Sequence, residues 1–426
     1  MKIAFHGVTI ADPRSDFNNQ TVDVLLMDGT VAAVEPHQSQ KKYDGDVVVK
    51  NCKGVYLSPG WFDLKANFRE PGHEQKETIE SGQAAAAKGG FTGVLVMPSV
   101  YPAIQKRSDV EFLLRKASHS KVEVHVAGSL TVNREGKDLA ELYDMKLGGA
   151  NIFTDDKRAI ANSGLLLRAL QYADNINAKV ITYADDKNLS GEANSNESAT
   201  TTLLGFKGSP AIAEGIALER DIRLAEYANT PLHCSGISSS EAITAIRTAK
   251  EMGLPVTAEV YAAHLMFTDE ILESFDSNYK VKPPFRSNSD REQLKEALLD
   301  GTIDCVVSDH CPEDVESKDV EFDYAAFGMI GLETTYSVLN TAFDGAITPE
   351  LVAKVLSINP RTILGIEVPS INVGAIANFT LFNPNEMVDY NSSEFKSKSR
   401  NTPFLNCSLK GKVMATINHD VLVDNF

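Results

Sequence analysis

The sequence has few of the residues on which disulfide-bonded, zinc-binding or membrane-spanning proteins depend. Its 426 residues include five cysteines and nine histidines, and neither a Cys-x-x-Cys nor a His-x-His pair occurs. An odd number of scattered cysteines favours a reduced, cytoplasmic protein over a disulfide framework. No apolar run approaches the roughly 18 residues that a membrane-spanning helix needs, and the first residues show no secretory signal.

Positive charge is also scarce. Lysine and arginine number 41 against 58 aspartate and glutamate residues, which gives a formal net charge of −17. A surface that binds nucleic acid or an anionic membrane needs clustered lysine and arginine, so we expect neither partner. The hydrophobic content of 43% is ordinary for a globular protein, and the length is sufficient for more than one domain.

The chain alternates strand-like and helix-like segments between two regions of short strands and turns. Residues 1–57, with a hairpin signal at Asp28-Gly29, and residues 369–426 have the strand-and-turn pattern. Residues 58–368 contain eight strand-like runs, at 61–67, 92–99, 122–130, 151–156, 179–186, 231–238, 255–264 and 302–312. Eight strand–helix units predict a (β/α)8 TIM barrel. The flanking regions predict a small β-sandwich domain formed by both termini.

Alternating polar residues mark the end of the first strand-like run. Lys65, Asn67 and Arg69 are two residues apart, and residues with that spacing share one face of a strand. Barrel enzymes place their catalytic groups at the C-terminal ends of strands. The sequence therefore predicts a functional site around these three side chains.

Two interpretations of this site stay open from the residues alone. Asp155, Asp156 and Asp309 end the fourth and eighth strands, and their carboxylates are able to bind a metal ion. Lys65 is predicted among them, and an ammonium group repels a dication and only donates hydrogen bonds. The alternative is a buried ion pair between Lys65 and these carboxylates, because a buried carboxylate without a cation is costly.

Two long polar stretches follow the fifth and eighth strands. Residues 190–202 and 313–324 lie where the active-site loops of a barrel are found. Each stretch is either a lid over the site or a mobile surface loop.

A series of motifs runs in the same order along nearly the whole chain: Phe68–Gly72, Lys76–Glu80, Gly89–Thr92, Met97-Pro98, Thr154–Asp156, Val281–Arg286, Ser308–His310, Phe327–Thr334, Ser357–Pro360 and Arg400–Phe404. Together they resemble the dihydroorotases, amidohydrolases of pyrimidine biosynthesis. The resemblance implies a barrel with a small β domain, a binuclear zinc site, and hydrolysis of dihydroorotate to N-carbamoyl-L-aspartate.

The chain departs from that family at the positions of the zinc ligands. The corresponding residues here are Lys65, Asn67, Asp155 or Asp156, Tyr183, Gly236 and Asp309. Four histidines are missing, so we expect no zinc cofactor, and Asp309 occupies the family's acid/base position. The resemblance places substrate contacts at Arg69, Ser99, Lys282, Glu313, Phe327 and Gly328, of which Arg69 and Phe327-Gly328 match the family.

Three functions follow from this resemblance and its departures. The first is a catalytically inactive, dihydroorotase-like partner of aspartate carbamoyltransferase. The second is an active or residually active dihydroorotase. The third is a protein that binds dihydroorotate or carbamoyl aspartate without reacting. Each of these is expected to be cytoplasmic and to form a homo-oligomer.

Overall fold

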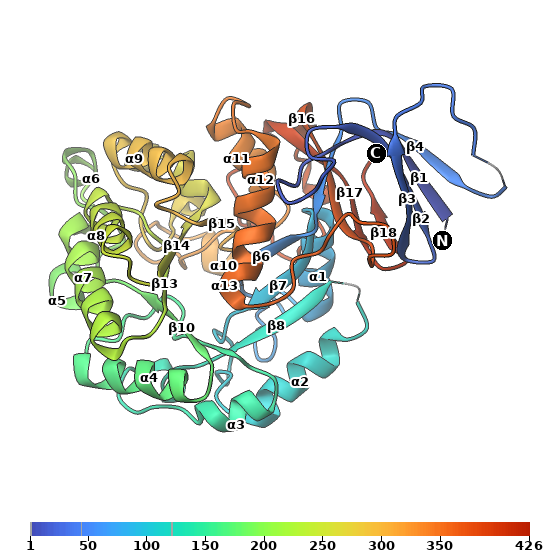
Figure 1. Cartoon of the computed structure of the whole chain (residues 1–426). Coiled ribbons are helices and arrows are strands. Elements are labelled where there is room, and N and C mark those ends of the chain that lie inside the picture. Colours follow the sequence, from blue (N-terminus) through green and yellow to red (C-terminus); the bar gives the residue numbers. More distant parts are fainter. Residues whose placement is uncertain (1, 44, 121) are drawn as a thin grey trace.

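A parallel barrel forms the centre of the molecule. The computed structural model describes residues 2–43, 45–120 and 122–426 (Figure 1). Eight neighbouring strands are hydrogen-bonded in chain order. They are β6 Trp61–Ala66, β7 Phe91–Val96, β8 Glu123–Gly128, β9 Ile152–Phe153, β10 Lys179–Tyr183, β13 Leu232–Ser235, β14 Val256–Tyr261 and β15 Cys305–Val307. The predicted (β/α)8 barrel is confirmed.

The barrel closes between its first and last strands. Ala66, at the end of β6, forms a parallel bridge with His310, and the N–H of Asn67 donates to the His310 carbonyl at 2.8 Å. In β6 and β7 every residue is buried, as expected for parallel strands that are covered on both faces. The strand ends are therefore held together at one mouth of the barrel.

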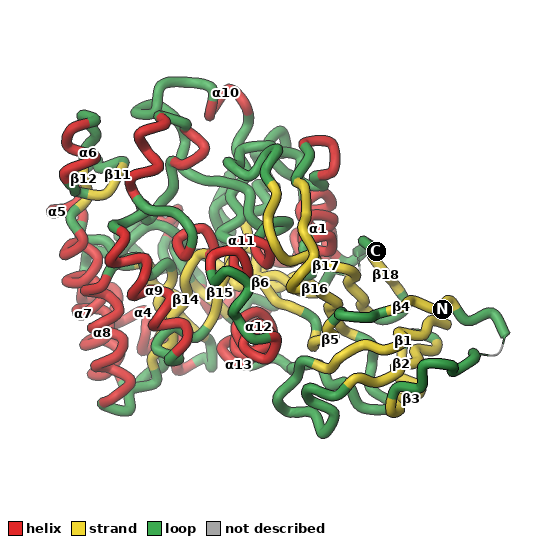
Figure 2. Tube along the Cα trace, turned by 90° about the horizontal axis from the view of Figure 1, so that it is seen from above, coloured by secondary structure: helices red, strands yellow, loops and turns green. Residues whose placement is uncertain are grey.

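Helices surround the barrel, as Figure 2 shows in red. An example is the helix Ser163–Asn175, which buries Leu165, Leu166, Ala169, Leu170 and Ala173, the stripe expected of an amphipathic helix. The helices are α1 Ile79–Lys88, α2 Arg107–Ala117, α3 Leu142–Leu147, α4 Ser163–Asn175, α5 Lys187–Ser190, α6 Ala199–Leu203, α7 Ala211–Ala228, α8 Ser240–Glu251, α9 Asn288–Leu299, α10 Val315–Lys318, α11 Thr335–Ala342, α12 Pro349–Ala353 and α13 Asn359–Leu364.

The remaining strands form a second, mostly antiparallel sheet from both ends of the chain (Figure 1). It contains β1 Lys2–Ile10, β2 Thr21–Met27, β3 Thr30–Pro36, β4 Val48–Asn51, β5 Tyr56–Pro59, β16 Asn378–Asp389, β17 Ser408–Asn418 and β18 Val421–Asp424. Strand β16 pairs with β5, so the C-terminal strands join the N-terminal ones directly.

Aromatic packing connects this sheet to the barrel. The Trp61 ring lies 5.1 Å from the Tyr336 ring and 5.5 Å from the Phe382 ring, measured between centroids. The indole N–H of Trp61 donates to Ser58 Oγ at 2.9 Å. Buried aromatic rings contribute much of the packing energy of such a contact, so the β domain supports the strand on which Lys65 lies.

The two polar stretches at residues 190–202 and 313–324, which were predicted as loops, contain short helices and a strand. The stretch after β10 contains α6 and strand β11 Ser195–Asn196, which pairs with β12 Gly208–Ser209. The stretch after β15 contains the short helix α10. Among the described residues, no helix is both long enough and apolar enough to cross a membrane.

Candidate active site at the barrel mouth

Three residues at the barrel mouth have a left-handed backbone conformation. Arg69, Asp156 and Asp309 have φ angles of 60°, 55° and 50°, and they follow the first, fourth and eighth barrel strands. A side chain in this region costs about 1–3 kcal/mol and persists where the surroundings fix it, as at binding and catalytic sites. The strained backbone at these three strand ends therefore indicates that they belong to one functional site.

Lys65 and Asp156 form a buried ion pair in the barrel. The Lys65 Nζ atom lies 2.6 Å from Asp156 Oδ1, and the two side chains are 1% and 6% exposed. Burial lowers the pKa of Lys65. The negative charges of Asp156, Glu259 and Asp309 raise it by a larger amount, so the pKa of Lys65 lies above its ordinary value. Burial raises the pKa of Asp156, and Lys65 and Lys157 outweigh burial and lower it. Both partners are therefore charged.

The neighbouring Asp155 points away from this pair. Its carboxylate accepts hydrogen bonds from the backbone N–H groups of Leu130 and Thr131, at 3.0 and 2.9 Å, and from the Thr131 hydroxyl. Asp155 thus holds the chain after β8, and Asp156 is the carboxylate that faces Lys65. The sequence alone left the choice between these two residues open.

Asp309 forms a second ion pair, with Lys157. The Lys157 Nζ atom lies 2.6 Å from Asp309 Oδ2, whereas Asp309 Oδ1 is buried and has no hydrogen-bond partner among the described residues. Burial raises the pKa of Asp309 to about 6, although the nearby Lys157 and Lys65 oppose that shift. Asp309 therefore has one anchored oxygen and one oxygen able to take or give a proton near neutral pH.

The ring of Tyr261, the last residue of β14, lies beside both lysines. The Lys65 and Lys157 ammonium groups lie 5.8 and 5.4 Å from the centre of its ring, within the range of cation–π attraction. Sequence reasoning assigned no role to Lys157 or Tyr261. The position of Lys157 beside Asp156 was the available signal, since a lysine at a strand end is placed to meet a carboxylate.

The residues at the mouth do not fit the family's zinc ions. Lys65 Nζ contacts Asp156 Oδ1. A metal ion bound to that oxygen would lie next to the ammonium group, which repels a dication and only donates hydrogen bonds. A Cβ added at Gly236 would lie 2.6 Å from the Tyr261 hydroxyl oxygen, so Tyr261 fills the space that a ligand side chain at position 236 would need. Tyr183 is buried, and burial raises its pKa well above the ordinary value, so it stays a neutral phenol.

Arg69 is occupied by contacts from the segment after the eighth strand. Its Nε donates to the Pro312 carbonyl at 2.9 Å, its Nη2 lies 2.9 Å from Cys311 Sγ, and Nη2 lies 2.6 Å from Glu313 Oε1. Lys76 contacts the other oxygen of Glu313. The predicted substrate positions Arg69 and Glu313 are thus brought together and bind each other.

The other predicted substrate positions lie around this centre. Ser99 contacts Asp156 through its hydroxyl group. Lys282 Nζ lies 3.3 Å from an Asp185 oxygen, and burial lowers the pKa of Lys282 to about 8. Lys282 and Phe327 line a cavity of about 30 Å³.

The backbone at Gly328 makes hydrogen bonds within the protein. Its N–H donates to the Lys280 carbonyl at 2.9 Å, and its carbonyl accepts from Lys318 and Asn401 at 3.1 Å each. A substrate contact at Phe327-Gly328 stays a prediction from the family resemblance.

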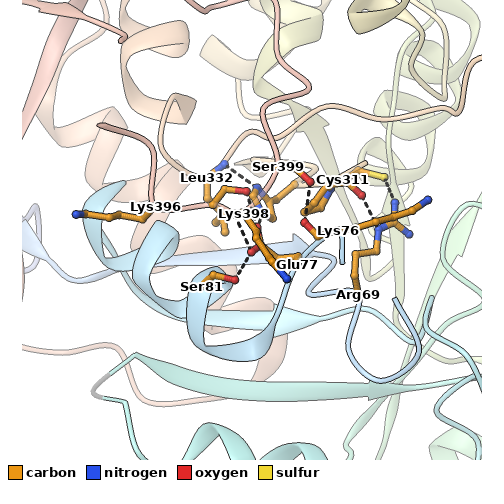
Figure 3. Close-up of polar contacts among 12 residues, drawn as sticks. Arg69, Lys76, Glu77, Ser81, Cys311, Leu332, Lys396, Lys398 and Ser399 are labelled. Atoms are coloured by element: carbon orange, nitrogen blue, oxygen red, sulfur yellow. Dashed lines mark hydrogen bonds and ion pairs between the residues drawn. The ribbon is translucent and has the colours of Figure 1, made fainter. Parts of the chain in front are cut away.

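His310 has a structural role. Its Nδ1 accepts from the Gly331 N–H at 3.2 Å, and its Nε2 lies 3.3 Å from Glu77 Oε2. Glu77 also accepts from the N–H of Lys398 at 3.0 Å (Figure 3). His310 therefore links the eighth strand to the start of α1 and to the C-terminal segment, whereas its neighbour Asp309 faces Lys157.

Two other groups of side chains among the described residues have the composition of metal ligands. His6, Asp23 and His37 lie in the β domain, and His233, Glu259 and Cys305 lie inside the barrel. The second group is fully buried, and its Glu259 accepts from Ser235 at 2.6 Å. Neither group includes Asp156 or Asp309.

Comparison with known proteins identifies relatives over the whole length. Residues 54–242 match the family model described as dihydro-orotase-like. A dihydroorotase of Syntrophus aciditrophicus is 39% identical over 419 residues, which cover 98% of each chain. A dihydroorotase of Pelotomaculum thermopropionicum is also 39% identical, covering 98% of this chain and 97% of the relative.

Solved structures share the fold at lower identity. The L-hydantoinase (dihydropyrimidinase) of Arthrobacter aurescens aligns with a TM-score of 0.86 at 21% identity, covering 99% of this chain and 96% of that one. The dihydropyrimidinase of Brevibacillus agri NCHU1002 aligns with a TM-score of 0.80 at 22% identity, covering 100% and 95%.

These relatives correct the leading functional expectation from the sequence. A catalytically inactive partner of aspartate carbamoyltransferase was expected because four histidines are missing. Proteins that are 35% to 39% identical over 98% of this chain are named dihydroorotases, which favours an enzyme. The missing histidines are a local change within a chain that otherwise matches named enzymes from end to end.

Proposed function

Because this chain belongs to the dihydroorotase family, we propose that it opens and closes the ring of dihydroorotate at the barrel mouth. The proposal depends on one observation, the placement of Asp309. This residue has one oxygen fixed by Lys157 and one without a partner, with a pKa of about 6. A general base needs such a free oxygen and a pKa near the working pH.

The proposed hydrolysis uses Asp309 as base and then as acid. Asp309 Oδ1 takes a proton from water while the water oxygen forms a bond to the ring amide carbon. Asp309 then returns that proton to the ring nitrogen as the carbon–nitrogen bond breaks, which gives N-carbamoyl-L-aspartate. Ring closure follows the same steps in reverse.

The two lysines provide the positive charge of this mechanism. Negative charge develops on the amide oxygen when water attacks, and fixed charges in a buried site stabilise it strongly. Lys65 and Lys157 are held by Asp156 and Asp309 at 2.6 Å each. Because the residues present do not fit the family's zinc ions, no step of the proposal uses a metal, and we expect the barrel mouth to bind none.

Turnover of dihydroorotate by the wild type and by Asp309→Asn tests this function. We expect turnover by the wild type and a loss of about 100-fold or more in the variant, the usual contribution of a general base. Asp300→Asn, at an exposed carboxylate that follows α9, is the matched control and should retain full activity. Equal rates in the wild type and Asp309→Asn would refute the mechanism.

The cellular setting is a further part of the proposal. All five cysteines are free and four are buried, which supports a reducing cytoplasm. Helix α7 exposes the apolar side chains of Ile212, Ile216 and Tyr227, and this exposure supports a homo-oligomer. An association with aspartate carbamoyltransferase rests on the family resemblance, and co-purification from the native cell tests it.

A further inference from the structure

A bulge in the β domain places two residues of one strand opposite a single aspartate. Strands β1, β2 and β3 are successive strands at one edge of the sheet (Figure 1). The register between β1 and β2 shifts between Phe5 and Val8, so His6 and Gly7 lie opposite Asp23 of β2. Bulges re-aim side chains and are common next to functional sites. This bulge brings the His6 imidazole to the Asp23 carboxylate.

A second imidazole reaches the same carboxylate from the end of β3. His37 follows the last residue of β3, and its Nδ1 lies 2.8 Å from Asp23 Oδ1. The Nδ1 of His6 lies 3.0 Å from the same oxygen. Gly7 has a φ angle of 71°, and a Cβ at this position would lie 3.2 Å from His37 Cε1. The absence of a side chain at Gly7 therefore leaves room for the His37 ring.

The backbone holds the Asp23 carboxylate from the inside. The N–H of Gly7 donates to Asp23 Oδ1 at 2.8 Å, and the N–H of Gln38 donates to Asp23 Oδ2 at 3.2 Å. Contacts of this kind orient a carboxylate that binds a metal ion. The Asp23 side chain is 1% exposed, whereas those of His6 and His37 are 17% and 31% exposed. The carboxylate is thus fixed, and the two imidazoles are open to an ion from solvent.

Asp23 Oδ1 is surrounded by more nitrogen atoms than it can accept hydrogen bonds from. The backbone nitrogen of Gly7 and the Nδ1 atoms of His37 and His6 lie 2.8, 2.8 and 3.0 Å from it. A carboxylate oxygen has about two lone pairs, and a neutral imidazole carries a proton on only one nitrogen. An imidazole nitrogen without a proton would turn its lone pair toward the negative charge. A cation bound between these atoms removes that repulsion.

The donor types and their spacing fit zinc. Two imidazole nitrogens and a carboxylate are zinc ligands, whereas calcium and magnesium prefer oxygen ligands. In a tetrahedral site with bonds of about 2.0 Å, neighbouring ligand atoms lie about 3.3 Å apart. The two histidine Nδ1 atoms lie 2.8 and 3.0 Å from Asp23 Oδ1, and the three ligand atoms lie within 4.8 Å of one another. Side-chain movements of a few tenths of an ångström therefore suffice to admit the ion.

We propose that His6, Asp23 and His37 bind one zinc ion, which joins β1, β2 and the segment after β3. Three protein ligands leave the fourth position for a water molecule. The Tyr43 hydroxyl lies 3.4 Å from His6 Nδ1, a distance beyond that of a good hydrogen bond, so a metal bond at His6 replaces only a weak contact. The role of the ion is structural. The inference does not depend on the proposed hydrolysis, because none of the three ligands lies in the barrel.

Calorimetric titration of the untagged, full-length protein with zinc chloride, after dialysis against a chelator, tests the site. We expect one zinc ion per chain with a Kd of about 1 µM or tighter. His6→Ala and His37→Ala should each weaken binding by more than about 100-fold, because loss of a partner outside the ligand set already costs 10- to 100-fold.

His125→Ala is the matched control. The Nε2 atom of His125 lies 2.6 Å from Glu123 Oε1, and the side chain is 32% exposed, so this imidazole also contacts a carboxylate at a similar exposure. The variant should bind zinc like the wild type. Circular dichroism checks that each metal-free variant is folded, and His37→Ala, at the more exposed position, decides the test if His6→Ala does not fold.

Cobalt in place of zinc identifies the ligands. Four-coordinate cobalt absorbs visible light strongly, and a thiolate ligand adds a near-ultraviolet band. We expect the visible absorption without the thiolate band. A thiolate band would place the metal at His233, Glu259 and Cys305 and overturn the proposal. No zinc binding by the wild type would overturn it too, since a proton then occupies the cluster, as would wild-type affinity in folded His37→Ala.

Discussion

The barrel mouth and the β domain each contain a cluster of polar side chains around carboxylates, and the two clusters differ in the nitrogen groups that contact those carboxylates. At the mouth, Asp156 and Asp309 face the ammonium groups of Lys65 and Lys157. In the β domain, the Nδ1 atoms of His37 and His6 lie 2.8 and 3.0 Å from one Asp23 oxygen. An ammonium group only donates hydrogen bonds, whereas a neutral imidazole nitrogen can also bind a metal ion.

This difference shows that the type of donor, and not the presence of carboxylates, decides what a cluster can bind. The mouth retains the carboxylates of a metal site but surrounds them with lysines, so its chemistry is proton transfer and charge stabilisation. The β-domain cluster has two imidazoles and a carboxylate, a ligand set that zinc accepts. Each prediction below changes one side of this comparison.

The largest effect is expected from Lys65→Met at the mouth. This substitution leaves the Asp156 carboxylate buried without its nearest cation, which should lower the free energy of unfolding by about 3–5 kcal/mol. Urea denaturation measures the change. The double variant Lys65→Met/Asp156→Asn removes both charges and should recover most of the loss, whereas an unchanged midpoint for Lys65→Met would contradict the buried pair.

Added zinc should act on the β domain and leave the mouth unaffected. We expect zinc to bind His6, Asp23 and His37, and to raise the free energy of unfolding by about 2.7 kcal/mol at 100 times its Kd. His37→Ala should abolish this stabilisation, and Lys65→Met/Asp156→Asn should retain it. Zinc that binds equally well to His37→Ala would disprove the assignment.

A change of pH is expected to alter the free energy of unfolding by a smaller amount, in opposite directions in the barrel and in the β domain. Burial raises the pKa of Asp63 in β6 to about 7 and that of Asp309 to about 6, above the unfolded value of about 3.9. The folded state therefore holds extra protons between about pH 4 and pH 7, and stability from these groups falls as pH rises through that window. Asp63→Asn should reduce this fall by about 2–3 kcal/mol between pH 5 and pH 8, measured by denaturation.

Asp23 shows the opposite pH behaviour. Burial raises its pKa, but the hydrogen bonds from His37, Gly7 and Gln38 outweigh burial and lower it. The stability that Asp23 contributes is present above its unfolded pKa and is lost as pH falls through the lower folded value. Asp23→Asn should therefore reduce the loss of stability below about pH 4, and an unchanged acid transition would contradict this assignment.

Much of the fold follows from local patterns, and the details of the site do not. The eight apolar runs and Lys65 at the end of the first predicted the barrel and a buried pair with an aspartate. The choice of Asp156 over Asp155 depends on a φ of 55° at Asp156, a backbone angle that the residue type does not determine. The Arg69–Glu313 contact joins residues 244 positions apart, and only the closed barrel brings them together.

The most direct test of the central claim is dihydroorotate turnover by protein dialysed against a chelator, measured together with its metal content. The account predicts that turnover persists without bound metal and is lost in Asp309→Asn, because Lys65, Lys157 and Asp309 carry the chemistry. No turnover by the chelated protein, with activity restored by added zinc, would contradict a metal-free site at the barrel mouth, and no turnover under either condition would contradict the proposed hydrolysis.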